Sequence, residues 1–243
     1  SAATPDPQVV LAVENLSLDF RLRTEILHAV RDVSFTLKRG QTLCLVGESG
    51  SGKSVTARAL LRIIDKNGAI TGGRILLRGK EKEIDIAPLT ERSRELLTIR
   101  GGGIGLIFQE PMSSLSPVHT IGSQIVEALR LHRRMDKAAA RAETISLLRQ
   151  VEIPNPEKMI DRYTFEFSGG MRQRAMIAMA LAADPEILIA DEPTTALDVT
   201  TQAEILDLIK RLQVERGMAM LLITHDMGVV AEVADEAAVM HFG

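Results

Sequence analysis

A glycine-rich octet at residues 47–54, with the sequence GESGSGKS, indicates chemistry through both its residue types and their spacing. It fits the pattern G-x-x-x-x-G-K-[ST], in which glycines let the backbone wrap closely around phosphate and point its amide N–H groups inward. Lys53 would place its ammonium group on the β- and γ-phosphates, and Ser54 would offer a hydroxyl group to Mg²⁺. The octet therefore predicts a bound nucleoside triphosphate. The alternative is a flexible Gly/Ser turn between a strand and a helix.

A second candidate site is the acidic pair Asp191 and Glu192, which ends the apolar run at residues 187–190. Ligands of parallel sheets bind at the carboxyl edge, where acids at the end of a buried strand have a use. Asp191 would help to hold Mg²⁺, and Glu192 would polarise an attacking water. Without the octet upstream, this segment reads equally well as a strand that leads into an acidic turn.

A third segment, FSGGMRQR at residues 167–174, begins a helical pattern. Ser168 is a favoured N-cap residue, and Gly169 and Gly170 would expose backbone donors suited to phosphate. Because the octet already supplies one phosphate site, this second one predicts a nucleotide shared between two protomers. The alternative is a capped helix whose glycines only permit a turn.

The hydrophobic pattern places these segments in an α/β fold. Alternating residues at 9–20 and 29–37 predict an antiparallel N-terminal sheet, and the apolar run at 41–46 predicts a buried strand before the octet. Further strands are expected at residues 75–77, 104–108, 187–190 and 218–224, and helices at 55–64, 121–132, 137–151, 170–183, 201–216 and from about 227. Apolar strands that alternate with helices indicate a parallel sheet covered on both faces, with a largely helical insertion between about Gln109 and Ala180.

The composition is that of an ordinary globular chain of 243 residues, with 45% hydrophobic and 25% charged residues. Its net charge of −3 gives no support for a nucleic-acid-binding surface, which usually shows a basic imbalance. The single cysteine, Cys44, excludes an internal disulfide, and its position in an apolar run predicts a packing role. No apolar run reaches the length of a membrane span, and no secretory signal is visible.

Taken together, these motifs resemble the nucleotide-binding subunits of ATP-binding-cassette transporters, and the resemblance covers nearly the whole chain. The motifs stand in the family's order: the phosphate loop at 47–54, the glutamine loop at Gln109, the signature at 168–173, the acidic pair, the loop at 196–198 and the switch residue His225. The chain looks most like the branch that serves peptide and nickel importers. One departure is Phe167, where the family usually has leucine; its apolar character should preserve the function of the signature.

The resemblance implies a P-loop NTPase (RecA-like) core with an N-terminal antiparallel β subdomain and an inserted α-helical subdomain. We expect the core at residues 1–109 and 181–243 and the helical signature subdomain at residues 110–180, within one nucleotide-binding domain. We also expect that the C-terminal extension usual in this branch is missing.

The resemblance also implies roles for individual residues. Phe20 would stack on adenine, although a phenylalanine at the end of a strand is otherwise a core residue. Gln109 would sense Mg²⁺ and the γ-phosphate, His225 would contact the γ-phosphate, and Asp198 would lie at the dimer interface. The expected catalytic residues are Glu192, His225 and Gln109, and the expected Mg²⁺ ligands are Ser54, Gln109 and Asp191. The expected ATP-binding residues are Phe20, Gly47, Glu48, Ser49, Gly50, Ser51, Gly52, Lys53, Ser54, Val55, Ser168, Gly169, Gly170 and Asp198.

The implied function is an ATPase that energises the import of peptides or a related solute. Its expected partners are a second nucleotide-binding subunit (a copy or a paralogue), transmembrane permease subunits and, indirectly, a solute-binding protein, at the cytoplasmic face of the membrane. An alternative is a soluble cassette ATPase that acts on DNA or ribosomes, but the expected long coiled-coil insertion or second cassette is absent from this sequence. A GTPase switch is disfavoured because the sequence lacks an Asn-Lys-x-Asp motif.

Overall fold

The computed structural model describes residues 6–48, 52–79, 82–194 and 196–240. These residues form two compact units: residues 1–100 together with 217–243, and residues 101–216. The division into a core and a helical subdomain at residues 110 and 180 remains a prediction. Within the described residues, no helix is both long enough and apolar enough to span a membrane.

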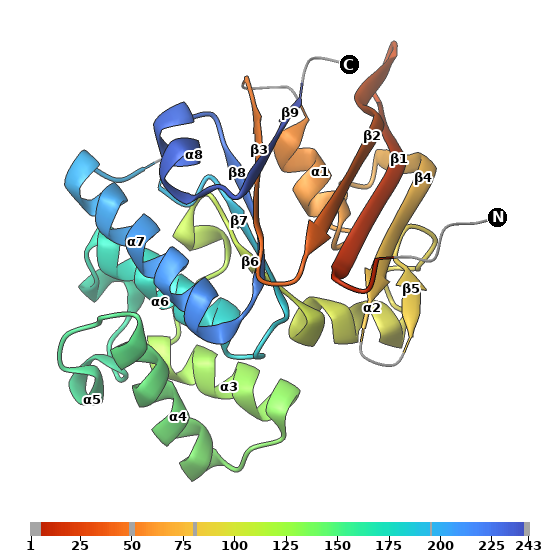
Figure 1. Ribbon diagram of the computed structural model, residues 1–243. Coiled ribbons are helices and arrows are strands. Elements are labelled where there is room, and N and C mark those ends of the chain that lie inside the picture. Colours follow the sequence, from red (N-terminus) through yellow and green to blue (C-terminus); the bar gives the residue numbers. More distant parts are fainter. Residues whose placement is uncertain (1–5, 49–51, 80–81, 195, 241–243) are drawn as a thin grey trace. The chain divides into compact units, whose positions relative to one another are not determined.

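The first unit contains an antiparallel sheet with the strand order β2-β1-β4-β5 (Figure 1). Its strands are β1 (Val9–Arg21), β2 (Ile26–Lys38), β4 (Gly68–Arg78) and β5 (Glu83–Asp85). The first two strands confirm the antiparallel pair expected from the alternating pattern. Their inward-facing side chains, including Leu11, Leu16 and Leu18, are fully buried and anchor this sheet to its core.

The strand β4 is longer than the segment expected at residues 75–77, because Gly72 and Gly73 lie inside it and do not end it. The register between β1 and β4 shifts at this point, between Glu14 and Ser17 on β1. Gly73 has a φ of +90°, and a Cβ there would collide with the backbone of Asn15. The glycine pair therefore forms a β-bulge, a site at which glycine is favoured within a strand.

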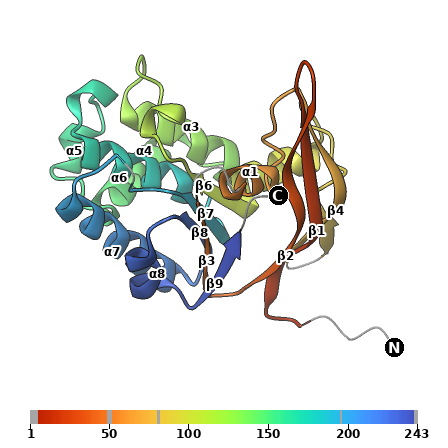
Figure 2. The same ribbon diagram turned by 90° about the horizontal axis from the view of Figure 1, so that it is seen from above.

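The first unit also contains three parallel strands, in which β3 (Thr42–Gly47) pairs with both β8 (Ala219–Thr224) and β9 (Glu236–Met240). Cys44, on β3, is fully buried, which confirms its predicted packing role. The helix α1 (Lys53–Ala59) contacts β2, β3 and β8 and lies between the antiparallel sheet and these parallel strands (Figure 2). The remaining helices of this unit are α2 (Arg94–Thr98) and α8 (Met227–Val233), and a π-helical turn at Ile99–Gly103 follows α2.

The helix α1 is shorter than the helix expected at residues 55–64. Arg62 adopts a left-handed conformation with a φ of +57°. The guanidinium group of Arg100 donates hydrogen bonds to the carbonyl groups of Leu61 and Arg62, at 2.8 and 3.0 Å. This distant side chain thus satisfies carbonyl groups that a longer helix would have paired within itself.

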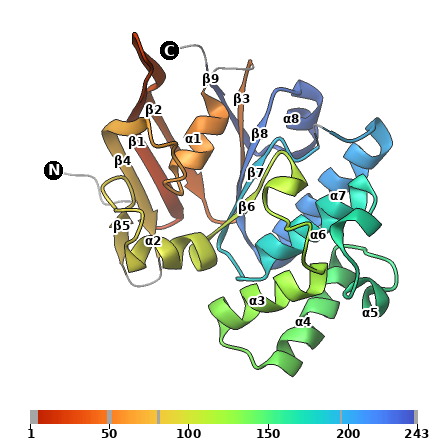
Figure 3. The same ribbon diagram turned by 180° about the vertical axis from the view of Figure 1, so that it is seen from behind.

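The second unit contains the parallel pair β6 (Ile104–Ile107) and β7 (Ile187–Asp191) and a group of helices. The helices are α3 (Ile121–Arg133), α4 (Lys137–Gln150), α5 (Pro156–Met159), α6 (Gly169–Leu181) and α7 (Val199–Arg216), with short 3₁₀ turns at Pro111–Ser113 and Thr164–Glu166. As Figure 3 shows, α6 lies among α3, α4 and α7 and contacts all three. The fully buried residues Ala175, Ile177 and Leu181 make α6 the central helix of this group.

Candidate nucleotide site

The phosphate loop begins where β3 ends, at Gly47, and leads into α1. The structure describes Gly47, Glu48 and the run from Gly52 onward, including Val55; the predicted ligands Ser49, Gly50 and Ser51 lie outside the described residues. Gly52 has a φ of +90°, and a Cβ built on it would collide with the carbonyl oxygen of Ala29 on β2. Only glycine therefore fits at the point where the loop meets the helix.

The side chain of Lys53 is oriented toward this loop. Lys53 is only 4% exposed, and its Nζ donates a hydrogen bond to the carbonyl group of Glu48 at 3.4 Å. At the end of the loop, the Thr56 hydroxyl group donates to the carbonyl group of Gly52 at 2.8 Å, and the methyl group of Met240 lies 3.6 Å from the Cβ position of Gly52. An ammonium group buried at the start of a helix and directed at a glycine loop is suited to bind phosphate.

His225 follows β8 at the same edge from which the phosphate loop emerges. Val46 of β3 pairs in parallel register with Thr224 of β8, so the residues that come next in both segments lie at the carboxyl edge. His225 is exposed there, between the buried strand and α8. Asp226 caps α8 by accepting a hydrogen bond from the N–H group of Gly228 at 2.8 Å, which fixes the backbone on the far side of His225.

Phe20 lies near the end of β1 in the same unit and is half-buried. Its ring contacts Gly68 so closely that a Cβ at that position would approach Phe20 Cε1 to 2.6 Å. One face of the ring is thus supported by the antiparallel sheet, and the side chain is not sealed in the core. This environment leaves both of the expected roles, adenine stacking and packing, available to Phe20.

In the second unit, Gln109 and the acidic pair also share a carboxyl edge. Ile107 of β6 pairs with Ala190 of β7; the acidic pair follows Ala190 directly, and Gln109 follows Ile107 after one residue. Asp191 is 2% exposed, whereas Glu192 and Gln109 are half-buried. Glu192 has a φ of +43°, a left-handed conformation that costs a non-glycine residue about 1–3 kcal/mol and that its surroundings must therefore stabilise.

The signature residues form the exposed N-terminus of α6. Ser168 caps the helix by accepting a hydrogen bond from the N–H group of Met171 at 3.3 Å, as predicted from its residue type. Ser168 and Gly169 are exposed, and the Cβ position of Gly170 lies 2.9 Å from a methyl group of Thr201 on α7. Phe167 is 3% exposed. The phenylalanine that stands where the family usually has leucine therefore preserves the apolar packing before the signature.

Asp198 is exposed and precedes α7. Its Oδ1 accepts a hydrogen bond from the N–H group of Thr201 at 2.8 Å. Hydrogen bonds from the backbone and side chain of Thr201 hold the pKa of the Asp198 carboxyl group below its usual value. Asp198 is therefore an ionised helix cap at neutral pH, a role that sequence reasoning did not assign to it.

The structure thus places the predicted residues in two groups. The phosphate loop, Phe20 and His225 belong to the first unit; Gln109, the acidic pair, the signature and Asp198 belong to the second. Sequence reasoning did not find Met240, which lies beside Gly52, and placed Gln173 in the signature without giving its buried side chain a role. The sequence could have indicated a hydrogen bond from Gln173, because a side-chain amide on the buried side of a helix requires a partner.

Oxygen donors dominate the candidate metal ligands. Ser54 supplies a hydroxyl group, Asp191 a carboxylate and Gln109 an amide oxygen, and oxygen ligands are those that Mg²⁺ prefers. The described residues contain no group of three or more His, Cys, Asp or Glu side chains that could hold a metal ion without a substrate. Each of these three residues thus has the type of donor that Mg²⁺ accepts, Ser54 in the first unit and Asp191 and Gln109 in the second.

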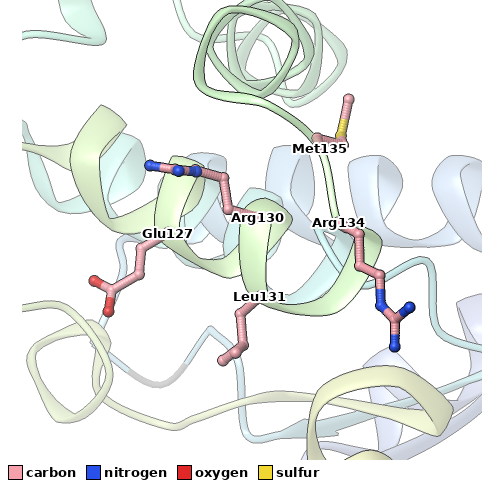
Figure 4. Close-up of a pocket in the computed structure, with 5 residues that line it drawn as sticks. All are labelled: Glu127, Arg130, Leu131, Arg134 and Met135. Carbon is pink, nitrogen blue, oxygen red and sulfur yellow. The ribbon is translucent and has the colours of Figure 1, made fainter.

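A separate open hollow of about 500 Å³ lies against α3 and the residues that follow it. Figure 4 shows its lining side chains fanning out from this segment: Glu127, Arg130, Leu131, Arg134 and Met135. It contains none of the motif residues, so the hollow is distinct from the candidate nucleotide site. Leu131 is 72% exposed, which is ordinary for a single apolar side chain on a surface.

The glycine loop between a buried parallel strand and a helix, with acids at the end of another parallel strand, defines a P-loop nucleoside triphosphatase. The family model described as ABC transporter matches residues 30–195. The chain therefore belongs to the ABC transporter family.

Relatives and solved structures agree with this assignment. The chain is 53% identical over 240 residues to the glutathione import ATP-binding protein GsiA of Pectobacterium atrosepticum, and 52% identical over 236 residues to that of Escherichia coli O157:H7. These alignments cover 98% and 96% of the chain but only 38% of each relative, so the chain spans well under half of their length.

Among solved structures, the post-hydrolysis dimer of the ATP-binding cassette MJ0796 bound to ADP and Pi matches with a TM-score of 0.81 and 29% identity, covering 95% of this chain and 94% of that one. CbiO1 from Clostridium perfringens, part of the transporter complex cbiONQ, matches with a TM-score of 0.76 and 27% identity, covering 96% and 85% of the two chains. The fold is therefore that of an ATP-binding cassette.

Proposed function

We propose that this chain is the ATP-binding and ATP-hydrolysing part of an importer for peptides or a related solute. The observation that carries the proposal is the placement of the motif residues at carboxyl edges of parallel strands. The phosphate loop and His225 follow β3 and β8 in register, and Gln109 and the acidic pair follow β6 and β7. Chemistry in parallel α/β sheets is performed at this edge.

The phosphate loop binds the triphosphate of ATP. Its backbone amides and the N-terminus of α1 surround the anion, and Lys53 adds a positive charge that is already partly desolvated. Phe20 supports the adenine ring by stacking. Each of these groups acts on the nucleotide before any bond is broken.

Ser54, Asp191 and Gln109 are the residues that would hold Mg²⁺. When bound, the ion neutralises the charge that develops on the phosphate oxygens. Glu192 polarises the attacking water as general base, and His225 contacts the γ-phosphate. The left-handed backbone of Glu192, held by the surrounding structure, would fix the direction of its side chain, as this role requires.

ATP also joins two nucleotide-binding subunits. The exposed N-terminus of α6, with Ser168, Gly169 and Gly170, is suited to the γ-phosphate of a nucleotide bound by a second subunit. Asp198 directly follows Leu197, whose side chain lies 3.8 Å from the Cβ position of Gly169, and Asp198 would sit at the same interface. Hydrolysis removes the γ-phosphate and lets the dimer open, a ligand-biased switch.

The transport partners are permease subunits in the membrane, and the chain acts at the cytoplasmic face. The relatives named for glutathione import support a peptide-like solute, carried through the permease and delivered by a solute-binding protein.

The test is the mass in solution of the Glu192→Gln variant with and without Mg·ATP. We expect a dimer only with ATP, together with a loss of turnover of about 10²- to 10⁴-fold, the usual contribution of a general base. Near-normal turnover would remove Glu192 as the base. A monomer that still binds ATP would show that this chain pairs with a paralogue or requires its membrane partner.

A further inference from the structure

Gln173 is a buried polar residue to which the proposed mechanism gives no role. It lies on α6, a turn beyond the signature glycines, and is only 1% exposed. Its side-chain amide Nε2 donates a short hydrogen bond to the backbone carbonyl group of Pro193. Since a buried amide without a partner is costly, this contact fixes both groups.

The acceptor of this hydrogen bond directly follows the proposed general base. Glu192 has a φ of +43°, and the residue after it is a proline. A residue before proline is driven toward extended conformations, so the left-handed backbone of Glu192 is disfavoured twice. Proline has no N–H group, so its carbonyl group is the only polar backbone atom through which position 193 can be held.

The far end of the same loop is also held. The side chain of Gln202 donates to the carbonyl group of Leu197 at 2.8 Å, and Asp198 caps α7 through the N–H group of Thr201. The loop after Glu192 is thus tied to α7 at one end and to the signature helix at the other. The hydrogen bond to the signature helix comes from Gln173, while Leu197 at the other end of the loop makes an apolar contact beside Gly169.

We propose that Gln173 is a positioning residue, which holds the backbone of Glu192 in its left-handed conformation and thereby couples the signature helix to the general base of the same chain. This inference rests on the proposed function. A shift of α6, caused by a nucleotide bound at its N-terminus, would be transmitted through Pro193 to Glu192. The attacking water would then be activated only when the signature is engaged.

The test compares Gln173→Met with Gln213→Met. Both changes keep the side-chain size and remove a buried amide, since Gln213 is also 1% exposed. Gln213, however, lies near the C-terminal end of α7. At a helical rise of about 1.5 Å per residue, it is about 20 Å from the start of that helix. We measure kcat and KM for ATP, and the thermal midpoint Tm, for the chain and both variants.

We expect Gln173→Met to lower kcat about 10- to 100-fold with KM changed less than about twofold, because misplacement by about 1 Å has effects of this size. Gln213→Met should lower Tm comparably and leave kcat near normal. In single turnovers, Gln173→Met should cost nothing further when Glu192 is already glutamine, since both changes remove the same function.

Any of three results would overturn the inference. They are an unchanged kcat in Gln173→Met, an equal loss of kcat in the two variants, and full additivity of Gln173→Met with Glu192→Gln. Absence of hydrolysis by the unaltered chain would instead count against the proposed function, so the two failures are distinguishable. If Gln173→Met does not fold, Gln173→Ala and Gln213→Ala replace the pair, because alanine leaves room for a water beside the carbonyl group of Pro193.

Discussion

The carbonyl oxygen of Ala29, on β2, occupies the space into which a Cβ of residue 52 would project. Gly52 is therefore fixed as glycine by two separate constraints. Its φ of +90° disfavours any L side chain, and the strand beside it leaves no room for a methyl group. The conformation of Gly52, where the phosphate loop meets α1, thus depends on its contact with β2.

We expect Gly52→Ala to abolish ATP binding and to destabilise the chain. The left-handed backbone alone costs about 1–2 kcal/mol, and displacement of Ala29 adds to that figure. Gly40→Ala is the matched control, because Gly40 has a φ of +70° but nothing within 4 Å of its Cβ position. Urea unfolding and ATP titration of both variants measure the effects. Equal destabilisation, with ATP binding retained in both, would contradict the steric role of Ala29.

Lys53→Ala should weaken ATP binding while the chain stays folded. The variant loses charge-assisted hydrogen bonds to phosphate, each worth about 1.5–3 kcal/mol, or about 10- to 150-fold in Kd. Lys66→Ala removes an exposed lysine of the same unit and should leave Kd unchanged. Calorimetric titration with Mg·ATP measures the Kd of both variants and of the unaltered chain. A Kd of Lys53→Ala within about twofold of normal would remove Lys53 from the site.

Phe20→Ala distinguishes adenine stacking from packing. If Phe20 stacks on the base, the Kd for ATP should rise by the equivalent of about 1–3 kcal/mol, whereas inorganic triphosphate, which has no base, should bind as before. Phe35→Ala is the control, since Phe35 is a half-buried phenylalanine of the neighbouring strand β2. If both variants lose stability alike and keep their ATP affinity, Phe20 has a packing role only.

The cap at Asp198 predicts a dependence of stability on pH. The pKa of Asp198 is lowered in the folded chain by the hydrogen bonds from Thr201, so folding favours the ionised carboxylate. The resulting stabilisation is complete above the ordinary aspartate pKa of about 3.9 and is lost as the pH falls through the lower folded value. Asp198→Asn keeps a capping side chain without the charge.

Thermal unfolding without nucleotide at a series of pH values tests this prediction. The Tm of the chain should exceed that of Asp198→Asn at neutral pH, and the difference should shrink as the pH falls below about 4. A difference that is constant over this range would show that the charge of Asp198 does not contribute to the cap.

The sequence predicted which strands and helices carry the site more accurately than it predicted the residues at which they begin and end. The cap at Ser168 and the strand that ends at Asp191 follow from local residue types, so the sequence alone predicts them. The end of α1 depends on the guanidinium group of Arg100, which comes from a distant part of the chain. Hydrophobic periodicity carries no information about such a partner.

The bulge at Gly72–Gly73 and the contact between Gln173 and Pro193 were missed for the same reason. A glycine pair is typical of both a turn and a bulge, and only the register against β1 distinguishes them. The sequence places Gln173 in the signature but does not reveal that its partner, Pro193, directly follows the proposed general base. The left-handed conformation of Glu192, before a proline, runs against local preference and depends on tertiary contacts.

The burial of Cys44 has a practical consequence. This thiol is the only one in the sequence, and it lies on the central strand β3, fully enclosed between β8 and β9. A thiol reagent can reach it only when that strand opens, so its labelling rate reports directly on opening of the strand that carries the phosphate loop. A cysteine introduced on the surface could meanwhile be labelled selectively in the native chain, without removing Cys44.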